Sequence, residues 1–260
     1  MTQDISISIE DGVQTLRFTR PEKKNALTSA MYVAINAALE RGDASCDVAA
    51  HLFIGSRGLF TAGNDINEFL ERSRGKADLT GPIVQFIRGL PLVKKPMIAA
   101  VDGLAVGIGT TMLLHCDLVY ATPAASFRTP FLDLGLVPEA GSSLVAPMRM
   151  GYQRAFELLA LGEPFTAERA REAGLVNAIV PAESLEAIAR RAAMQLAAKP
   201  PEALAATRRL MRGDPQAILA RIDEEVAIFA ERLSSPEARE AFSAFLEKRP
   251  PDFAKTRRED

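Results

Sequence analysis

The sequence has little of what metal, redox and membrane proteins depend on. Its 260 residues include no tryptophan, only two cysteines (Cys46 and Cys116) and only two histidines (His51 and His115). Two isolated cysteines cannot form a disulfide framework, and we interpret both as reduced thiols of the core. Two histidines without paired cysteines leave too few ligands for a metal site. No apolar run approaches the ~18 residues of a membrane span.

An excess of charge of one sign is also missing. The 31 lysines and arginines face 33 aspartates and glutamates, which gives a formal net charge of −2 at pH 7. This balance argues against a nucleic-acid-binding surface. The first residues, Met-Thr-Gln-Asp, resemble neither a signal peptide nor a transit sequence, so we expect a soluble cytoplasmic protein. With 48% apolar residues the chain can bury a large core.

Short apolar runs alternate with helical patterns over roughly the first 180 residues. Residues 5–18 predict a hairpin with its turn at Asp11-Gly12, and Thr28 predicts the cap of a helix that ends at Gly42. Runs typical of buried parallel strands occupy 51–55, 97–101, 118–121 and 175–180. Helices are expected at 66–75, 80–93, 108–115 and 151–161. This alternation predicts an α/β fold with right-handed crossovers.

The chain changes character after Pro181. Alanine, glutamate, arginine and leucine dominate from there to Lys248, and proline-containing breaks divide the stretch into four helices. We therefore expect a core over 1–195 and a C-terminal helical segment over 196–260. That segment has more apolar residues than one thin core layer needs, which favours a role in trimerisation. They are Ile218, Ile222, Val226, Phe229, Phe242 and Phe245.

Three glycine-containing segments can carry chemistry. Residues 55–66 and 102–111 each follow a predicted strand, where glycines leave backbone N–H groups open to a ligand, although ordinary turns explain each segment alone. Residues 129–143 contain Glu139 among apolar and small neighbours, which should raise its pKa and make it a usable base. A carboxylate at a helix start is the equally supported alternative. Asp133 is a weaker candidate.

The order and spacing of these segments resemble the crotonase (enoyl-CoA hydratase/isomerase) superfamily. The likeness extends over about residues 5–253 and includes Phe-Thr-Ala-Gly-Asn-Asp-Ile at 60–66 and Asp-Gly-Leu-Ala-Val-Gly-Ile-Gly at 102–109. Further matches lie at 20–27, 116–117, 135–138, 173–176 and 245–249. The resemblance implies a spiral of ββα turns, assembly as a homotrimer or a dimer of trimers, and an acyl-CoA substrate. It implies no permanently bound cofactor, since coenzyme A enters as part of the substrate.

The resemblance also assigns roles to individual residues. It places an oxyanion hole at the backbone N–H groups of Ala62 and Ile108, where they would stabilise the oxygen of an enolate. The residues expected to bind the CoA substrate are Lys23, Lys24, Ala62, Asn64, Asp65, Ile66, Gly107, Phe131, Phe245 and Lys248. Phe245 and Lys248 match positions that in some members reach the ligand of a neighbouring subunit.

Two departures from the hydratase pattern bear on the reaction. Thr111 and Phe131 stand where a typical hydratase carries its two glutamates, so efficient hydration is not expected. Glu139 matches the single catalytic glutamate of the peroxisomal-type Δ3,Δ2-enoyl-CoA isomerases. The resemblance therefore implies a β-oxidation isomerase that moves a 3-enoyl-CoA double bond to the 2-position. Another crotonase reaction, such as hydration or dehalogenation, and an inactive CoA-binding homologue are the alternatives.

Overall fold

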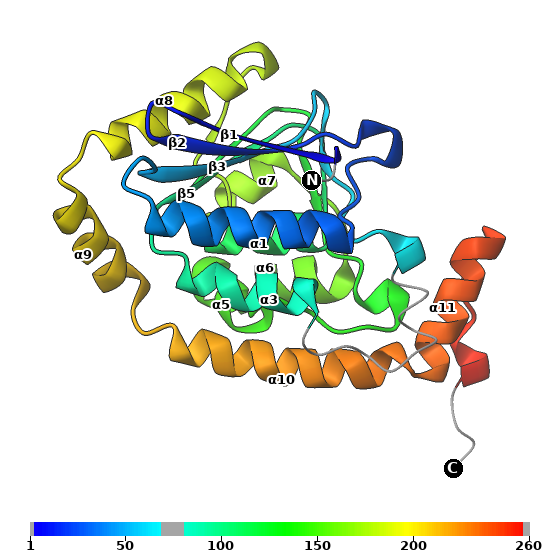
Figure 1. The fold of residues 1–260 in the computed structure, drawn as a ribbon. Helices are drawn as coiled ribbons and strands as arrows, with labels where there is room; N and C mark the ends of the chain where they lie inside the picture. The colour runs from blue at the N-terminus through cyan, green and yellow to red at the C-terminus, as the bar shows by residue number, and fades with distance from the viewer. Residues whose placement is uncertain (1–2, 69–80, 257–260) are drawn as a thin grey trace.

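The computed structural model describes residues 3–68 and 81–256, in which the chain winds through two β-sheets (Figure 1). The larger sheet has the order β1-β2-β3-β5-β7-β10. Its strands are Ile5–Glu10, Val13–Phe18, Ala50–Ile54, Met97–Val101, Leu118–Ala121 and Ala178–Ile179. The smaller sheet has the order β4-β6-β8-β9, with strands Leu59–Thr61, Leu104–Val106, Ser126–Arg128 and Phe165–Thr166.

The path of the chain is a spiral of ββα turns. The strand pairs β3-β4, β5-β6 and β7-β8 each give one strand to the larger sheet and the next to the smaller one, and a helical segment follows. Strands in equivalent positions pair in parallel, as β3 does with β5 and β4 with β6. The ends of β4, β6 and β8 therefore lie side by side. This arrangement confirms the fold class that the sequence predicts.

Helices cover both faces of the larger sheet. Helices α1 (Ser29–Ala44) and α3 (Pro82–Gly89) belong to the main core together with Leu16 and Phe53. Helix α8 (Leu185–Ala197) covers the opposite face, where it packs on Leu52 and Ile98 (Figure 1). Strands buried on both faces are expected to be apolar throughout, which is why 52–54 and 97–101 are continuous apolar runs.

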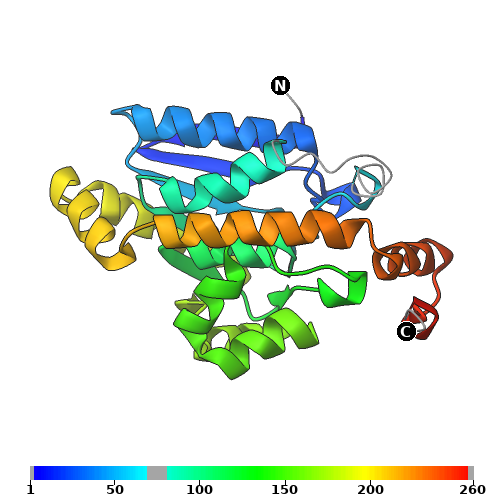
Figure 2. The ribbon, with the colours of Figure 1, turned by 90° about the horizontal axis from the view of Figure 1, so that it is seen from below.

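The remaining helices belong to the spiral of the core or to the C-terminal segment. They are α4 (Ile108–Thr111), α5 (Ser142–Met150), α6 (Tyr152–Phe156), α7 (Ala167–Glu172), α9 (Pro201–Arg212), α10 (Gln216–Leu233) and α11 (Pro236–Glu247). A 3₁₀ turn, Met112–His115, continues α4, and a π-helical turn, Glu157–Leu161, continues α6. Helix α10 crosses the molecule on the side away from α8 (Figures 1 and 2). Within the described residues, no helix is both long and apolar enough to span a membrane.

Most of the predicted elements are confirmed. The β1–β2 hairpin turns at Asp11 and Gly12 with φ of 50° and 75°, the left-handed pair that a two-residue hairpin turn requires. The four helices after Pro181 form as expected, and the predicted boundary at 195 falls in the last turn of α8. Of the predicted helix 66–75, residues 66–68 are helical and 69–75 lie outside the described residues.

Other parts of the fold were predicted wrongly, incompletely or not at all. The strand predicted over 175–180 is only Ala178–Ile179. The smaller sheet was missed, because its strands have two or three residues and lie in segments interpreted as loops. Cys116 is buried as expected, but Cys46 is exposed because it lies in the connection after α1. Of the apolar residues assigned to an oligomer surface, only Phe245 is exposed (55%). The others, Ile218, Ile222, Val226, Phe229 and Phe242, pack against this chain's own core.

Gly42 does not end helix α1, as the sequence predicted, but lies inside it against the larger sheet. A Cβ atom at this position would lie 2.5 Å from Gln14 Oε1 and 2.6 Å from His51 Cε1. The ring of His51 is fixed, since Nδ1 lies 2.9 Å from Gln14 Oε1 and Nε2 lies 3.2 Å from Asp43 Oδ1. His51 is thus a core histidine, and Gly42 permits close packing of the helix on the strands.

Gly42→Ala is therefore expected to destabilise the protein by about 1–3 kcal/mol, because overpacking outweighs the gain in helix propensity. Gly89→Ala is the matched control, since Gly89 is also helical and an added Cβ would meet nothing within 4 Å. Urea unfolding of both variants measures the difference. Equal stability of the two variants would contradict this account of Gly42.

Candidate active site

Two backbone loops meet where strands β4 and β6 end. Thr61 pairs with Ala105 in the parallel register, and a glycine with positive φ follows each strand, Gly63 at 86° and Gly107 at 55°. A Cβ atom on Gly63 would lie only 2.7 Å from the carbonyl oxygen of Val106. The backbones of the two loops are therefore in direct contact, and only glycine fits at position 63.

The structure corrects the first of the two predicted oxyanion donors. The N–H of Ala62 donates to the carbonyl oxygen of Lys24 at 2.9 Å and is not available to a ligand. The N–H of Asn64, two residues further on, has no hydrogen-bond acceptor among the described residues. The same holds, within residues 3–68 and 81–256, for the N–H of Ile108 in the first turn of α4. Asn64 and Ile108 thus each supply an open amide, one from each loop.

The first loop is held in place by the segment that precedes helix α1. Asn25 is fully buried, and its side-chain amide donates to the carbonyl oxygens of Leu59 and Phe60 at 3.2 and 3.0 Å. The side chain of Asn64 accepts a hydrogen bond from Tyr32 Oη at 2.5 Å. These contacts fix the backbone around Asn64. The residues joined by these contacts lie 32 to 35 positions apart in the sequence.

The residues predicted to bind CoA have different surroundings. Lys23 and Lys24 are exposed, beside the first loop through the Lys24–Ala62 hydrogen bond. The Asp65 carboxylate lies 2.7 Å from Arg20 Nη1; burial raises the pKa of Asp65, but the hydrogen bond and charge of Arg20 bring it below its usual value. Ile66 packs against the main core. The carboxylate of Asp65 therefore has a structural partner.

The other predicted contacts lie outside the two loops. Phe131 is buried in the main core and precedes the 3₁₀ turn Leu132–Leu134. Phe245 and Lys248 are exposed at the end of α11, and their role toward a neighbouring subunit's ligand stays a prediction. Asp133, the weaker candidate base, forms a surface ion pair of 2.8 Å with Arg128.

Glu139 is brought to the second loop by a side-chain hydrogen bond. Its side chain is buried (7% exposed), and Oε1 accepts a hydrogen bond from the hydroxyl of Thr111. Thr111 lies in the same short helix as Ile108, so the carboxylate is one turn of α4 from an open amide. Asp65 is also buried beside Asn64 but is paired with Arg20. Among the described residues, the site thus combines two amide donors with one buried carboxyl group that has no ion-pair partner, that of Glu139.

Burial makes Glu139 a weak acid. Loss of hydration raises the pKa of its carboxyl to about 8; the Thr111 hydrogen bond opposes this shift, and the negative charge of Glu225 adds to it. A group with such a pKa can both take and return a proton near neutral pH. The expectation that apolar surroundings would raise the pKa of Glu139 is confirmed, and helix α5 begins only at Ser142.

Sequence analysis missed three residues that act on Glu139. Thr111 was noted only as a missing glutamate, and its hydroxyl proves to be the partner of the remaining one. His115 was considered only as one of two histidines too few for a metal site; it is buried, and its Nε2 lies 2.7 Å from the carbonyl oxygen of Ala140. Glu225 comes from helix α10 and gives no local signal in the sequence.

Comparisons with known proteins agree with this geometry. The family model for enoyl-CoA hydratase/isomerase matches residues 8–256. The chain belongs to this family. Members of the family act on CoA thioesters, so the protein is an acyl-CoA enzyme of the enoyl-CoA hydratase/isomerase family.

Similar members of the family differ in the reactions that their names state. Rat enoyl-CoA delta isomerase 2 is 34% identical over 96% of this chain, which spans 65% of the rat protein's length. The 2,3-dehydroadipyl-CoA hydratase of Escherichia coli K12 is 32% identical, over 96% of this chain and 98% of its own. The structure of OdaA from Pseudomonas aeruginosa superimposes with a TM-score of 0.89 and 44% identity, covering 94% of this chain and 99% of that one. Family membership thus leaves open whether this enzyme is an isomerase or a hydratase.

The contact at Gly63 gives a test of the amide pair. Gly63→Ala is expected to lower kcat/KM by on the order of 10²-fold or more, because the added Cβ displaces the loop that carries the Asn64 amide. Gly58→Ala is the control, since Gly58 has a similar φ of 73° but nothing within 4 Å of an added Cβ. Turnover of an enoyl-CoA by both folded variants measures the effect. Equal activities would show that the contact between the loops is dispensable.

The Thr111 hydrogen bond gives a test of the base. Glu139 must be ionised to take a proton, so kcat/KM should rise with pH through about 8. Because the Thr111 hydroxyl stabilises the ionised form, Thr111→Val should raise the pKa of Glu139 and move this rise to higher pH. Thr111→Ser keeps the hydroxyl and should restore the profile of the unmodified protein. If the pH dependence of kcat/KM is the same in Thr111→Val as in the unmodified protein, Thr111 does not influence the ionisation of Glu139.

Proposed function

We propose that this enzyme converts 3-enoyl-CoA to 2-enoyl-CoA, with Glu139 as its only acid and base. The observation that carries the proposal is a buried carboxyl group, that of Glu139, which lies beside two open amides and has no ion-pair partner among the described residues, whereas the buried Asp65 is paired with Arg20. The chemistry needs no second titratable group, because the proton that leaves C2 returns at C4. The rat relative named an enoyl-CoA delta isomerase supports the same reaction.

The reaction follows from these groups. The thioester oxygen accepts hydrogen bonds from the N–H groups of Asn64 and Ile108, which lowers the energy of negative charge on that oxygen. The Glu139 carboxylate takes a proton from C2, and the electron pair of that C–H bond enters a dienolate that ends at the thioester oxygen. The protonated Glu139 then gives the same proton to C4, while a double bond forms between C2 and C3. No atom is gained or lost.

Hydration fits the site less well. Addition of water requires one group that activates the water and one that supplies a proton. Thr111 cannot act as a carboxylate base, and its hydroxyl is already bonded to Glu139. Phe131 is an apolar core residue. We therefore propose that hydration is at most a trace activity, although a similar protein is named a hydratase.

An inactive CoA-binding homologue is the candidate from another class. Burial of an ionisable group costs folding free energy, and a protein that only binds CoA does not need a buried carboxyl group with a pKa of about 8. Two amides without acceptors among the described residues carry a similar cost. Both features favour a catalyst.

The proposal also includes the location and the assembly of the enzyme. We propose that it is cytoplasmic and that it assembles as a trimer or a dimer of trimers.

Two measurements test this function. Glu139→Gln should lower turnover of a 3-enoyl-CoA by about 10²–10⁴-fold, the usual contribution of general acid–base catalysis, and should leave CoA binding intact. In the unmodified enzyme, kcat/KM for the isomerisation should exceed that for hydration of crotonyl-CoA by on the order of 10²-fold. Product chromatography distinguishes the two reactions. Hydration equal to or faster than isomerisation would overturn the proposal, as would full activity of Glu139→Gln.

A further inference from the structure

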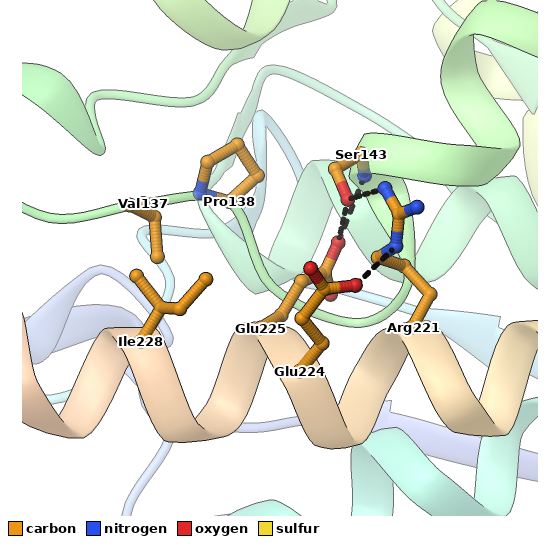
Figure 3. A pocket seen from close by; sticks show the side chains of 7 residues that line it. All are labelled: Val137, Pro138, Ser143, Arg221, Glu224, Glu225 and Ile228. Carbon is orange, nitrogen blue, oxygen red and sulfur yellow. Dashed lines mark hydrogen bonds and ion pairs between the residues drawn. The ribbon is translucent and has the colours of Figure 1, made fainter.

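A carboxylate on the C-terminal helix α10 reaches the turn that carries Glu139. Glu225 is buried (4% exposed), and its two oxygens accept three hydrogen bonds, from Gly141 N at 2.6 Å, Ser143 N at 3.0 Å and Ser143 Oγ at 2.5 Å. These partners lie 82 to 84 positions away in the sequence. Figure 3 shows Glu225 pointing from α10 toward Ser143, on the wall of a cavity of about 150 Å³.

The turn that Glu225 contacts has an unfavourable backbone. Ala140 has φ of 60°, a left-handed value that is uncommon for a residue with a side chain, and Gly141 follows with φ of 70°. Such a conformation persists only where surrounding contacts hold it. A Cβ atom on Gly141 would lie 2.9 Å from Ile218 Cγ2, so the turn is pressed against α10. From the other side, His115 Nε2 lies 2.7 Å from the carbonyl oxygen of Ala140.

We propose that Glu225 is a positioning residue for Glu139, which it holds in place through the 139–143 turn and influences through its negative charge. This inference rests on the proposed role of Glu139 as the acid and base. Glu225 does not reach the substrate in this proposal. It acts only through the Glu139 carboxyl group.

The charged groups around the pair favour this role. Arg221 on the same helix lies 3.0 Å from Glu224 and 3.4 Å from Ser143 Oγ, so it faces the polar end of the cavity (Figure 3). Burial raises the pKa of Glu225 above its usual value, and the hydrogen bonds from Ser143 and Gly141 and the charge of Arg221 offset only part of this shift. Its three donors all favour the ionised form. An ionised Glu225 opposes ionisation of the nearby Glu139.

The other charged or titratable groups that face this region are His115 and the ion pair between Arg88 and Asp223. Burial lowers the pKa of His115 to about 4, with smaller effects from the charges of Arg212 and Arg149, so its ring is neutral near pH 7. Helix α3 packs against α10, where its Arg88 is paired with Asp223. The negative charge that Glu139 meets from α10 is therefore that of Glu225.

Two variants of Glu225 separate the effect of side-chain length from the effect of its negative charge. Glu225→Gln keeps the length of the side chain and removes the charge, so the rise of kcat/KM with pH should move to lower pH by roughly half a unit or more. It also loses an acceptor for Gly141 N, so kcat should fall. Glu225→Asp keeps the charge and shortens the reach, so kcat should fall while the rise stays at its original pH. Glu231→Gln is the matched control, an exposed carboxylate further along the same helix, and should leave both quantities unchanged.

Glu139→Gln is measured in parallel, because its full activity would mean that the proposed function fails. If Glu139→Gln is impaired but both Glu225 variants keep the kcat and the pH profile of the unmodified enzyme, only the inference about Glu225 fails. A profile that moves equally in the Gln and Asp variants would also overturn it, since loss of charge could not then be the cause. Thermal unfolding confirms that each variant is folded, and calorimetric titration with CoA should give the same affinity in all of them.

Discussion

The contact between two loop backbones is the constraint on which the rest of this site depends. The parallel pairing of β4 with β6 brings the two strand ends into register, and Gly63 leaves room for the loops to touch. Only then do the amides of Asn64 and Ile108 lie near each other. Because α4 begins at Ile108, its next turn brings Thr111, and through it Glu139, to the same place. One backbone contact thus determines both the donors and the base.

The base that results is unfavourable for folding. The pKa of Glu139 is about 8 in the folded protein and near 4.5 in an unfolded chain, so between these values the folded state binds the additional proton. Stability therefore falls as the pH rises through this window, where the ionised, active form of Glu139 accumulates. Contacts from three separate elements hold the group in place, namely Thr111 in α4, His115 in the turn after it and Glu225 in α10. The C-terminal helices are thus part of the site as well as of the fold.

Sequence patterns predicted those parts of the fold whose signal is local. The hairpin turn at Asp11-Gly12 needs two left-handed residues, and the strand at 97–101 is apolar because both its faces are covered. The smaller sheet has no such signal, because three residues are too few to show a period of two. Gly42 was misread for a related reason. The sequence alone does not distinguish a glycine that ends a helix from a glycine that lets a helix approach a strand. The structure does, because His51 and Gln14 lie where a Cβ atom on Gly42 would be.

In the site, too, sequence patterns predicted only those properties that depend on residues close together in the sequence. The apolar neighbours of Glu139 are its neighbours in the sequence, so its raised pKa could be predicted. The sequence could not predict which backbone N–H of the first loop is open, because this depends on hydrogen bonds to residues 24–27. Leu27 pairs in parallel with Asn64: the N–H of Leu27 donates to Gly63 O, and the N–H of Asp65 donates to Leu27 O. In such a bridge the paired residue's own N–H points to the other side, away from Leu27. The open donor is therefore the amide of Asn64, while that of Ala62 is occupied by Lys24.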